Sequence, residues 1–373
     1  MVSYIVSFKG SLYCFYVENS GLFWRKHEGG NWSDATCIKK YGVTKFTISL
    51  SSEQVLILCQ NVSYVKKIIF DGGVISISTL VSGTLNGQYY GINTGEDNGM
   101  HLLHNILVQE EQSQILMSHN VSPQGLWSNS KHLGRIIPFD TYTPYWVVPI
   151  HGQHYLVFYQ EANTTGFGVD LGYREIYGSS DMGDFKTIHP SSNLNSRNFS
   201  FLANTNGVHM VYKIKNIMNS SLVYQKLDEG GLSSKMIVAQ GQAVHSPIVY
   251  IENNQVNIAF MRGFDIFSCK VSGGKQVEVS QPQKHNETIS QNIMVSKFLQ
   301  ENEGKNRFAS NEIYTDSNKP WDVKFFSQIY SDITGQKNHS LQNITPPQSP
   351  MVGKQEEYDS FFEVFEAEDF HTK

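Results

Sequence analysis

Residues 4–37, YIVSFKGSLYCFYVENSGLFWRKHEGGNWSDATC, decide the fold that this sequence predicts. Runs rich in Tyr, Phe, Val and Trp alternate here with short turns that contain Gly or Asn, a pattern typical of antiparallel meanders. The pattern predicts strands at residues 4–8, 12–17 and 22–27, followed by a corner at Asn31-Trp32-Ser33. Such a unit cannot bury both of its faces alone, so it requires neighbours of the same kind.

Degenerate copies of this unit recur along the chain. They begin near residues 4, 45, 88, 145, 199, 246 and 292. A spacing of roughly 40 to 57 residues matches one four-stranded blade of a β-propeller. We therefore expect a single all-β propeller, with seven blades as the best count and six or eight also compatible. A pair of β-sandwiches does not account for seven copies, and a β-helix would need shorter and more regular turns.

The same alternation predicts the later strands. They are expected at residues 45–50, 55–60, 65–70, 74–80, 100–108, 113–119, 154–160, 172–178, 208–213, 221–227, 255–260, 264–271, 293–299, 308–314 and 322–330. Only closure of a ring removes exposed sheet edges. The first strand, at 4–8, is therefore expected beside the last blade, at 322–330.

The composition changes after the propeller, which we place at residues 1–333. Residues 334–354 are rich in Gln, Asn, Ser and Pro and predict a flexible linker. Residues 355–373 form an acidic, aromatic peptide. From Val352 onward the chain holds seven acidic residues and two lysines, so this end accounts for the formal charge of −5 of the whole chain.

The acidic peptide carries four phenylalanines, Phe361, Phe362, Phe365 and Phe370. On a helix, positions 358, 361, 362, 365 and 369 would lie on one side and make a short apolar stripe. We hypothesise that this stripe docks into an apolar groove rimmed by Lys or Arg on another protein. The alternatives are a frayed end and the start of a further region.

Charge and motifs exclude several classes of function. A charge of −5 without a basic cluster argues against binding to nucleic acid or to an anionic membrane. Neither a signal peptide nor an apolar run of about 18 residues is recognisable, so a cytoplasmic or non-classically exported bacterial protein is expected. The cysteines and histidines lack metal-ligand spacing, so we predict no metal and no cofactor. Cys14, Cys59 and Cys269 are expected to be buried as small apolar residues.

One turn resembles a known motif. Ser179, Asp181 and Gly183, followed by Phe185, resemble the Asp-box of sialidase-like and lectin-like propellers, with the aromatic residue one position early. In those proteins the box is a structural fastener, which implies that Asp181 caps turn amides and that Gly183 adopts a backbone conformation suited to glycine. The chain has only six arginines, and Arg135-Ile136-Ile137-Pro138 has one residue more than the Arg-Ile-Pro of sialidases. A catalytic sialidase is therefore disfavoured.

Tryptophans near strand ends are the candidate ligand-binding residues. Trp24, Trp32, Trp127 and Trp146 could stack on sugar rings, although packing between blades explains such residues better. The acids to test for a glycosidase pair are Asp140, Asp170, Glu175 and Asp181. We predict a non-catalytic binding or scaffold protein that recognises a protein or a glycan. A carbohydrate-active enzyme is the alternative, and the oligomeric state is open.

Overall fold

The structure is a computed structural model. It describes residues 3–51, 53–83, 87–93, 100–107, 114–122, 126–139, 145–151, 154–162, 168–177, 181–190, 198–215, 219–272, 278–285, 293–300 and 308–326. Contacts divide the chain into a compact unit of residues 1–336 and a second unit of residues 337–373. All described residues belong to the first unit, and the predicted linker and acidic peptide lie outside them.

The described residues form β-strands and turns, without an α-helix. Tight turns join the strands as the sequence predicts. Lys9 and Gly10 have φ angles of 48° and 68°, and Asn19 and Ser20 have 48° and 62°. Two successive positive φ angles define the type I′ hairpin turn, whose twist matches that of the strands it joins. Local sequence therefore sets the meander.

Five of the six hydrogen-bonded sheets are meanders of strands that follow one another in the chain. The first is β6 (Lys45–Leu50), β7 (Val55–Gln60), β8 (Tyr64–Asp71) and β9 (Val74–Ser82). The second is β10 (Tyr89–Asn93), β11 (Met100–Leu107), β12 (Gln114–Val121) and β13 (Lys131–Ile136). The third is β14 (Trp146–His151), β15 (His154–Ala162), β16 (Val169–Tyr177), β17 (Asp181–Met182) and β18 (Lys186–His189).

The next two meanders repeat this plan. One is β19 (Phe199–Asn204), β20 (Gly207–Lys215), β21 (Ser220–Asp228), β22 (Gly231–Leu232) and β23 (Met236–Gln240). The other is β24 (Val244–Glu252), β25 (Gln255–Arg262), β26 (Asp265–Ser272), β27 (Glu278–Val279) and β28 (Gln283–Lys284). Strand β30 (Phe308–Ser310) joins this last sheet by pairing with β24.

The sixth sheet joins the two ends of the described chain. It holds β1 (Ser3–Phe8), β2 (Ser11–Glu18), β3 (Gly21–Glu28), β4 (Asn31–Trp32) and β5 (Thr36–Lys39), together with β29 (Ile293–Gln300), β31 (Glu312–Asp316) and β32 (Val323–Lys324). Strand β1 pairs with β29 in parallel, from Tyr4 opposite Lys297 to Ser7 opposite Gln300. The sheet therefore connects residues about 290 positions apart, which is the closure that the repeats predict.

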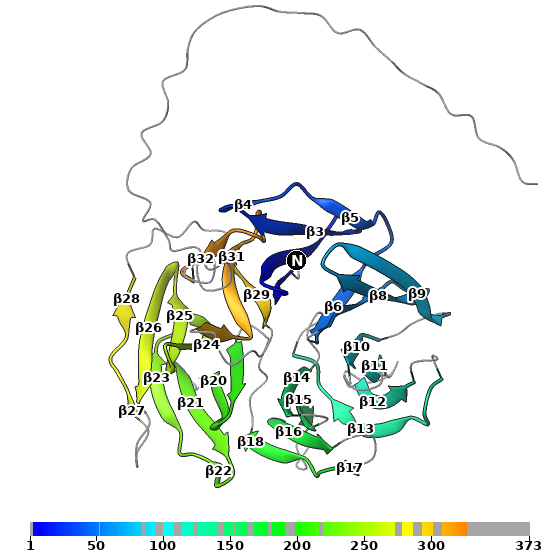
Figure 1. Cartoon of the computed structure of the whole chain (residues 1–373). Coiled ribbons are helices and arrows are strands. Elements are labelled where there is room, and N and C mark those ends of the chain that lie inside the picture. Colours follow the sequence, from blue (N-terminus) through cyan, green and yellow to red (C-terminus); the bar gives the residue numbers. More distant parts are fainter. Residues whose placement is uncertain are drawn as a thin grey trace, which may run out of the picture. The chain divides into compact units, whose positions relative to one another are not determined.

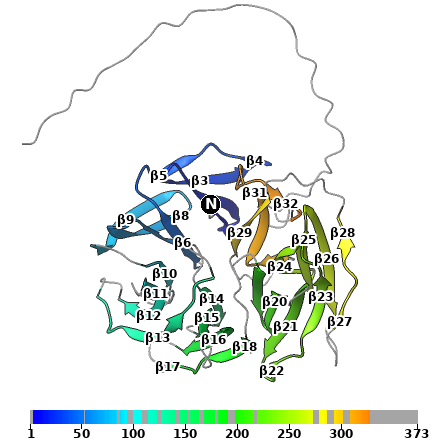
Figure 2. The same ribbon diagram turned by 180° about the vertical axis from the view of Figure 1, so that it is seen from behind.

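Within this unit the sheets follow one another around a ring (Figures 1 and 2). Strands β6, β14, β24 and β29 lie toward its middle, and β5, β9, β17, β22 and β28 lie at its periphery (Figure 1). Antiparallel meanders repeated radially in this way form a β-propeller. The all-β architecture that the sequence predicts is therefore confirmed.

Apolar residues fill the spaces between neighbouring sheets. Phe70 of β8 makes edge contacts with Tyr13, Phe15 and Trp24 of the sheet beside it, with ring centroids 5.1–5.2 Å apart. Large buried aromatics supply much of the apolar area that such an interface removes from water. Cys14, Cys59 and Cys269 are buried free thiols, as predicted, whereas Cys37 is exposed.

Three strand predictions need correction. The partner of β1 is β29, not residues 322–330, because the strands toward the middle of the ring are the ones that meet. The strand expected at 308–314 breaks at Asn311 into β30 and β31, and these belong to different sheets. The outer strands β5, β13, β18 and β23 were not predicted, because outer strands with exposed polar residues lack strong alternation.

Candidate functional site

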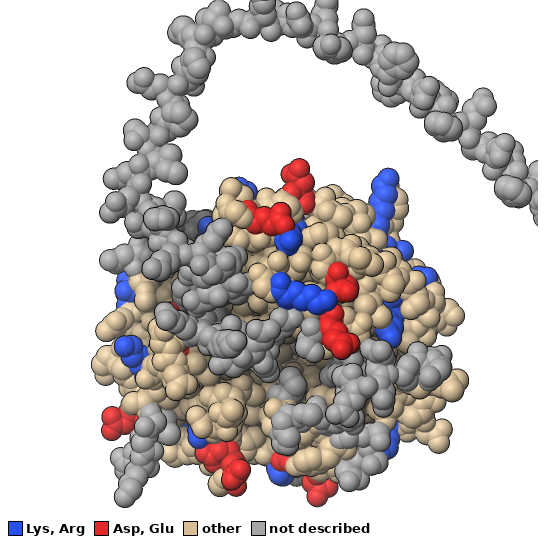
Figure 3. All heavy atoms as spheres, in the orientation of Figure 1, with Lys and Arg blue, Asp and Glu red and all other residues tan. Residues whose placement is uncertain are grey.

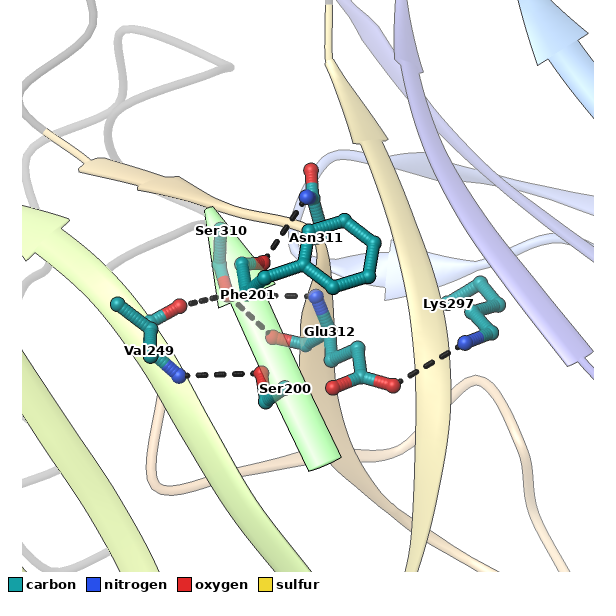
Figure 4. A network of polar contacts seen from close by, with 7 residues as sticks. All are labelled: Ser200, Phe201, Val249, Lys297, Ser310, Asn311 and Glu312. Atoms are coloured by element: carbon teal, nitrogen blue, oxygen red, sulfur yellow. Dashed lines mark hydrogen bonds and ion pairs between the residues drawn. The ribbon is translucent and has the colours of Figure 1, made fainter. Parts of the chain in front are cut away.

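An ion pair toward the middle of the ring contains a buried carboxylate. Lys297 of β29 lies 3.1 Å from a carboxylate oxygen of Glu312 on the adjacent strand β31 (Figure 4). The Glu312 side chain is 4% exposed and that of Lys297 is 20% exposed. Burial raises the pKa of Glu312, and the Lys297 ammonium and a hydrogen bond from Ser200 oppose that rise.

The Lys297 ammonium also lies over the indole ring of Trp146 on β14. Trp146 is 7% exposed and packs edge-on against Phe201 of β19, with ring centroids 5.3 Å apart. Its indole Nε1 has no hydrogen-bond acceptor among the described residues. The Lys297 ammonium thus contacts both the Glu312 carboxylate of its own sheet and the Trp146 ring of another sheet.

Backbone contacts around Glu312 join three sheets (Figure 4). The Val249 amide of β24 donates to Ser200 Oγ of β19 at 3.2 Å, and Ser310 Oγ donates to the Val249 carbonyl at 3.1 Å. Asn311 Nδ2 donates to the Phe201 carbonyl at 3.0 Å. Polar groups buried here are therefore satisfied by neighbouring strands, and the cluster holds the sheets together.

The other three candidate tryptophans lie away from this cluster. Trp24 of β3 is partly buried between sheets and contacts the rings of Tyr13 and Phe70. Trp32 of β4 is partly buried and lies edge-on to His27 at 5.3 Å. Trp127 is 39% exposed and lies edge-on to His119 at 5.2 Å. The structure does not bring the four together, and Trp127 is the most accessible of them.

The turn that resembles an Asp-box is described in part. Ser179 lies outside the described residues, and Asp181 begins β17 with its side chain not described. The Gly183 amide donates to the Glu175 carbonyl at 2.8 Å, which fastens the turn to β16. Gly183 does not have a left-handed φ, and a Cβ there would meet Glu175 Cβ at an ordinary 3.6 Å. The expectation of a conformation suited to glycine is therefore wrong.

The same hydrogen bond, from a turn amide back to a strand carbonyl, recurs at corners whose sequences show little similarity to residues 179–185. The Ser33 amide donates to the Lys26 carbonyl at 2.7 Å, and the Lys26 amide donates back to Ser33 Oγ at 3.0 Å. Three other serines repeat both bonds on their own sheets, namely Ser128, Ser233 and Ser280. The signal in the sequence is an apolar residue followed by serine, as in Trp32-Ser33 and Trp127-Ser128. Trp32 and Trp127 thus stand at equivalent structural corners.

An arginine that bonds both a tyrosine hydroxyl and a turn carbonyl stabilises two of these corners. Arg25 donates to the Tyr16 hydroxyl at 3.2 Å and to the Ser33 carbonyl at 2.6 Å. Arg174 makes the same two bonds, to the Tyr159 hydroxyl at 2.7 Å and to the Gly183 carbonyl at 3.0 Å. These two arginines are therefore occupied by structural contacts. Sequence reasoning missed the pairing because Tyr and Arg lie on different strands.

The four acids proposed for a glycosidase pair do not assemble in the described residues. Asp140 lies outside them, and the side chain of Asp181 is not described. Asp170 and Glu175 are five residues apart on β16, which places them on opposite faces of that strand. Burial raises the pKa of Glu175, but hydrogen bonds from Lys186 and Tyr177 outweigh it and leave that pKa lowered. This favours a salt-bridged surface carboxylate.

Histidines gather on β11 and β12 without forming a metal site. His101 bonds to Ser118 Oγ at 2.5 Å, and His104 stacks on Tyr89 and on His119 with centroids 5.0 Å apart. Burial lowers the pKa of both His101 and His104 to about 4, so these rings are neutral at pH 7. The described part of the chain holds no group of three or more His, Cys, Asp or Glu placed to bind a metal. It also holds no helix long and apolar enough to cross a membrane.

Comparison with known proteins yields structural similarity alone. No protein-family model matches the chain, and no curated protein sequence matches it. A polysaccharide lyase, the PL25 ulvan lyase, is similar over 85% of this chain and 89% of its own, at 9% identity and a TM-score of 0.49. An α-L-arabinofuranosidase from Podospora anserina is similar over 57% and 82%, at 11% identity and 0.36. An endo-arabinase from Bacteroides thetaiotaomicron is similar over 60% and 92%, at 10% identity and 0.36. These values are too low to transfer an activity.

Proposed function

We propose that this chain is a non-catalytic binding module, a rigid ring of sheets whose outer strands contact a partner protein. The observation that carries the proposal is where large apolar side chains are exposed. Among the described residues most of them lie on outer strands or corners, including Val74 at 73%, Leu126 at 72% and Ile237 at 59%. Large apolar side chains exposed on an outer strand are available for contact with another protein.

The central ion pair supports a structural role for the middle of the ring. Glu312 is held by Lys297 and Ser200, and Lys297 is held by Trp146 in turn. A glycosidase needs two carboxylates that face one bond, with one of them able to give up or take a proton. A buried carboxylate that is compensated by lysine and bonded to Ser200 serves better to join strands from different sheets.

The distribution of charge is compatible with a contact that does not depend on strong electrostatic steering. On the face drawn in Figure 3, acidic and basic side chains are interspersed among a majority of neutral residues. Such a surface creates no large field of a single sign. Partner recognition would then rest on apolar contact and backbone pairing at the outer strands.

We further propose that the propeller has seven blades. The eight-stranded sheet reads as two blades joined by the β1–β29 pairing, one made of β1–β5 and the other of β29, β31 and β32. The other five sheets supply one blade each. Ring closure through paired strands from both ends of the chain is a known means of protecting propeller edges.

Two measurements on the intact purified chain test the binding function. Hydrogen–deuterium exchange is recorded with and without a protein that co-purifies with the chain, and protection is expected on outer strands such as β9 and β23. In parallel, the chain is incubated with a panel of polysaccharides. Cleavage that disappears in Glu312→Gln would support the carbohydrate-active alternative and refute a non-catalytic role.

A further inference from the structure

Strand β9 is a sheet edge with a longer regular, uncharged stretch than the other outer strands that the structure describes. It is the last strand of its sheet and pairs with β8. The outer strands of four other sheets are split into two short pieces, β4/β5, β17/β18, β22/β23 and β27/β28, and β13 carries Lys131 and Arg135. Strand β9 instead spans nine residues, VISISTLVS, without a charge. Its pairing with β8 is regular from Val74 to Thr79 and shifts register only beyond Thr79, toward the end of the strand. Short, bulged or charged edges prevent pairing with other chains, so the regular part of β9 is suited to accept a strand.

The side chains of β9 extend this edge into a contact surface. Val74 is 73% exposed and Ile77 is 49% exposed, and residues three apart on a strand project to opposite faces. An added strand would therefore gain backbone hydrogen bonds and apolar contacts on both faces. This is the mode of recognition called β-augmentation.

The surroundings of β9 are basic. Residues 34–73 hold five lysines, two aspartates and one glutamate, and Asp71, opposite Val74 of β9, is paired with Lys9. Two of these lysines mark one end of β9: the ammonium groups of Lys39 and Lys66 lie 5.1 and 5.4 Å from the ring centroid of Tyr64, which pairs with Ser82. Basic side chains follow the right-hand edge of Figure 3, where Figure 1 places β5, β8 and β9. An acidic strand is the complementary occupant.

The chain's own sequence contains such a strand. Residues 355–373 hold seven acids and one lysine, and their middle part, Ser360-Phe361-Phe362-Glu363-Val364-Phe365, is rich in residues that favour strands. In an extended backbone, Phe361 and Phe365 would lie on one face and Phe362 and Val364 on the other. Apolar groups on both faces match the exposed side chains of β9.

We propose that β9 is a docking edge for residues 355–373 of a second copy of this chain, which add to it as an extended strand. The inference rests on the proposed binding function, because it takes an outer strand as the contact surface. The segment would bind as a strand and not as the helix that its phenylalanine stripe suggests, because a sheet edge forms hydrogen bonds with an extended backbone. Reciprocal exchange of the segment between two copies gives a closed two-fold dimer.

The test uses a fluorescent synthetic peptide of residues 355–373. It is titrated into the full chain carrying Phe361→Ser and Phe365→Ser, so that the chain's own segment does not compete. We expect saturable binding that weakens several-fold as salt rises from about 50 to 500 mM. A scrambled peptide of the same composition is expected not to bind. Hydrogen exchange is expected to slow on β9 when the peptide is present.

Two matched variants separate the β9 edge from the rest of the surface. Ile77→Lys on β9 is expected to weaken peptide binding about tenfold or more, because a charge is placed on the paired edge. Ile237→Lys changes an isoleucine of similar exposure, 59%, on the outer strand β23 and is expected to change binding less than about twofold. The docking edge would be overturned by any of three results. The peptide binds Ile77→Lys as tightly as the parent chain, the scrambled peptide binds as tightly as the native one, or the peptide slows hydrogen exchange on strands other than β9.

Sedimentation of the unaltered full chain identifies the source of the strand. A dimer that the Phe361→Ser/Phe365→Ser variant does not form supports exchange between copies. A monomer at concentrations above the dissociation constant of the peptide refutes a second copy as the source. Failure of the peptide experiment together with partner-induced protection on another outer strand would refute this inference and leave the proposed function standing. Cleavage of a polysaccharide would refute the proposed function alone.

Discussion

Closure of the ring can be tested by a disulfide across the two ends of the propeller. Ser3 of β1 and Ser296 of β29 are both buried, and their Oγ atoms lie 2.6 Å apart although 293 positions separate them in sequence. A disulfide bond spans about 2.05 Å between sulfurs, so Ser3→Cys with Ser296→Cys places two thiols close enough to bond. The background also carries Cys37→Ser, because Cys37 is the exposed thiol.

The expected stabilisation follows from the length of the loop that the disulfide closes. For a loop of 293 residues, the chain-entropy relation gives about 5 to 6 kcal/mol at 25 °C if the native state is unstrained. The unit spans residues 1–336 and would unfold with an entropy of about 0.7 kcal/mol/K. The melting temperature of the oxidised protein should therefore exceed that of the reduced protein by about 7 to 9 °C.

The assay compares oxidised and reduced forms of one protein by thermal unfolding, with faster migration in non-reducing gel electrophoresis as evidence that the bond has formed. The single variants Ser3→Cys and Ser296→Cys serve as controls and should not respond to reductant. A natively folded double variant that forms no disulfide, or a disulfide that leaves the melting temperature unchanged, would refute closure through β1 and β29.

The central cluster and the tryptophans lead to three further predictions. Because burial raises the pKa of Glu312, the folded state binds the proton of this carboxyl group more tightly than the unfolded chain does. The free energy of unfolding of the wild type should therefore fall as pH rises above about 4.5. That of Glu312→Gln should fall less, as measured by denaturant unfolding at pH 4 and pH 7. Lys297→Met leaves the buried carboxylate without its cation and should cost about 3 to 5 kcal/mol at pH 8; an unchanged unfolding midpoint would show that the pair is dispensable. Trp146→Ala should cost about 3 to 5 kcal/mol, and Trp127→Ala roughly half as much because Trp127 is 39% exposed; loss of glycan-array binding by a stable Trp127→Ala would instead favour a sugar platform there.

Local sequence determined the strands and turns of this protein. Alternating Tyr, Phe and Val with Gly and Asn turns predicted β1, β2 and β3 to within one residue of their ends, because residues close in sequence decide both the pleat and the hairpin turn. The repeat spacing predicted an all-β ring, and burial of Cys14, Cys59 and Cys269 followed from their places in apolar strands. These features depend on interactions over fewer than about 60 residues.

Tertiary structure decided which strands meet and which groups share a site. Trp146 lies far in the chain from Lys297 and Glu312, and no local pattern marks Lys297 and Glu312 as a pair. The break at Asn311 and the pairing of β30 with β24 also depend on bonds to other sheets, such as that from Asn311 to Phe201. Side-chain periodicity reports which face of a strand is buried, but it carries no information about which sheet lies against that face. The side-chain contacts in the middle of the ring therefore depend on ring closure and could not be predicted from local sequence.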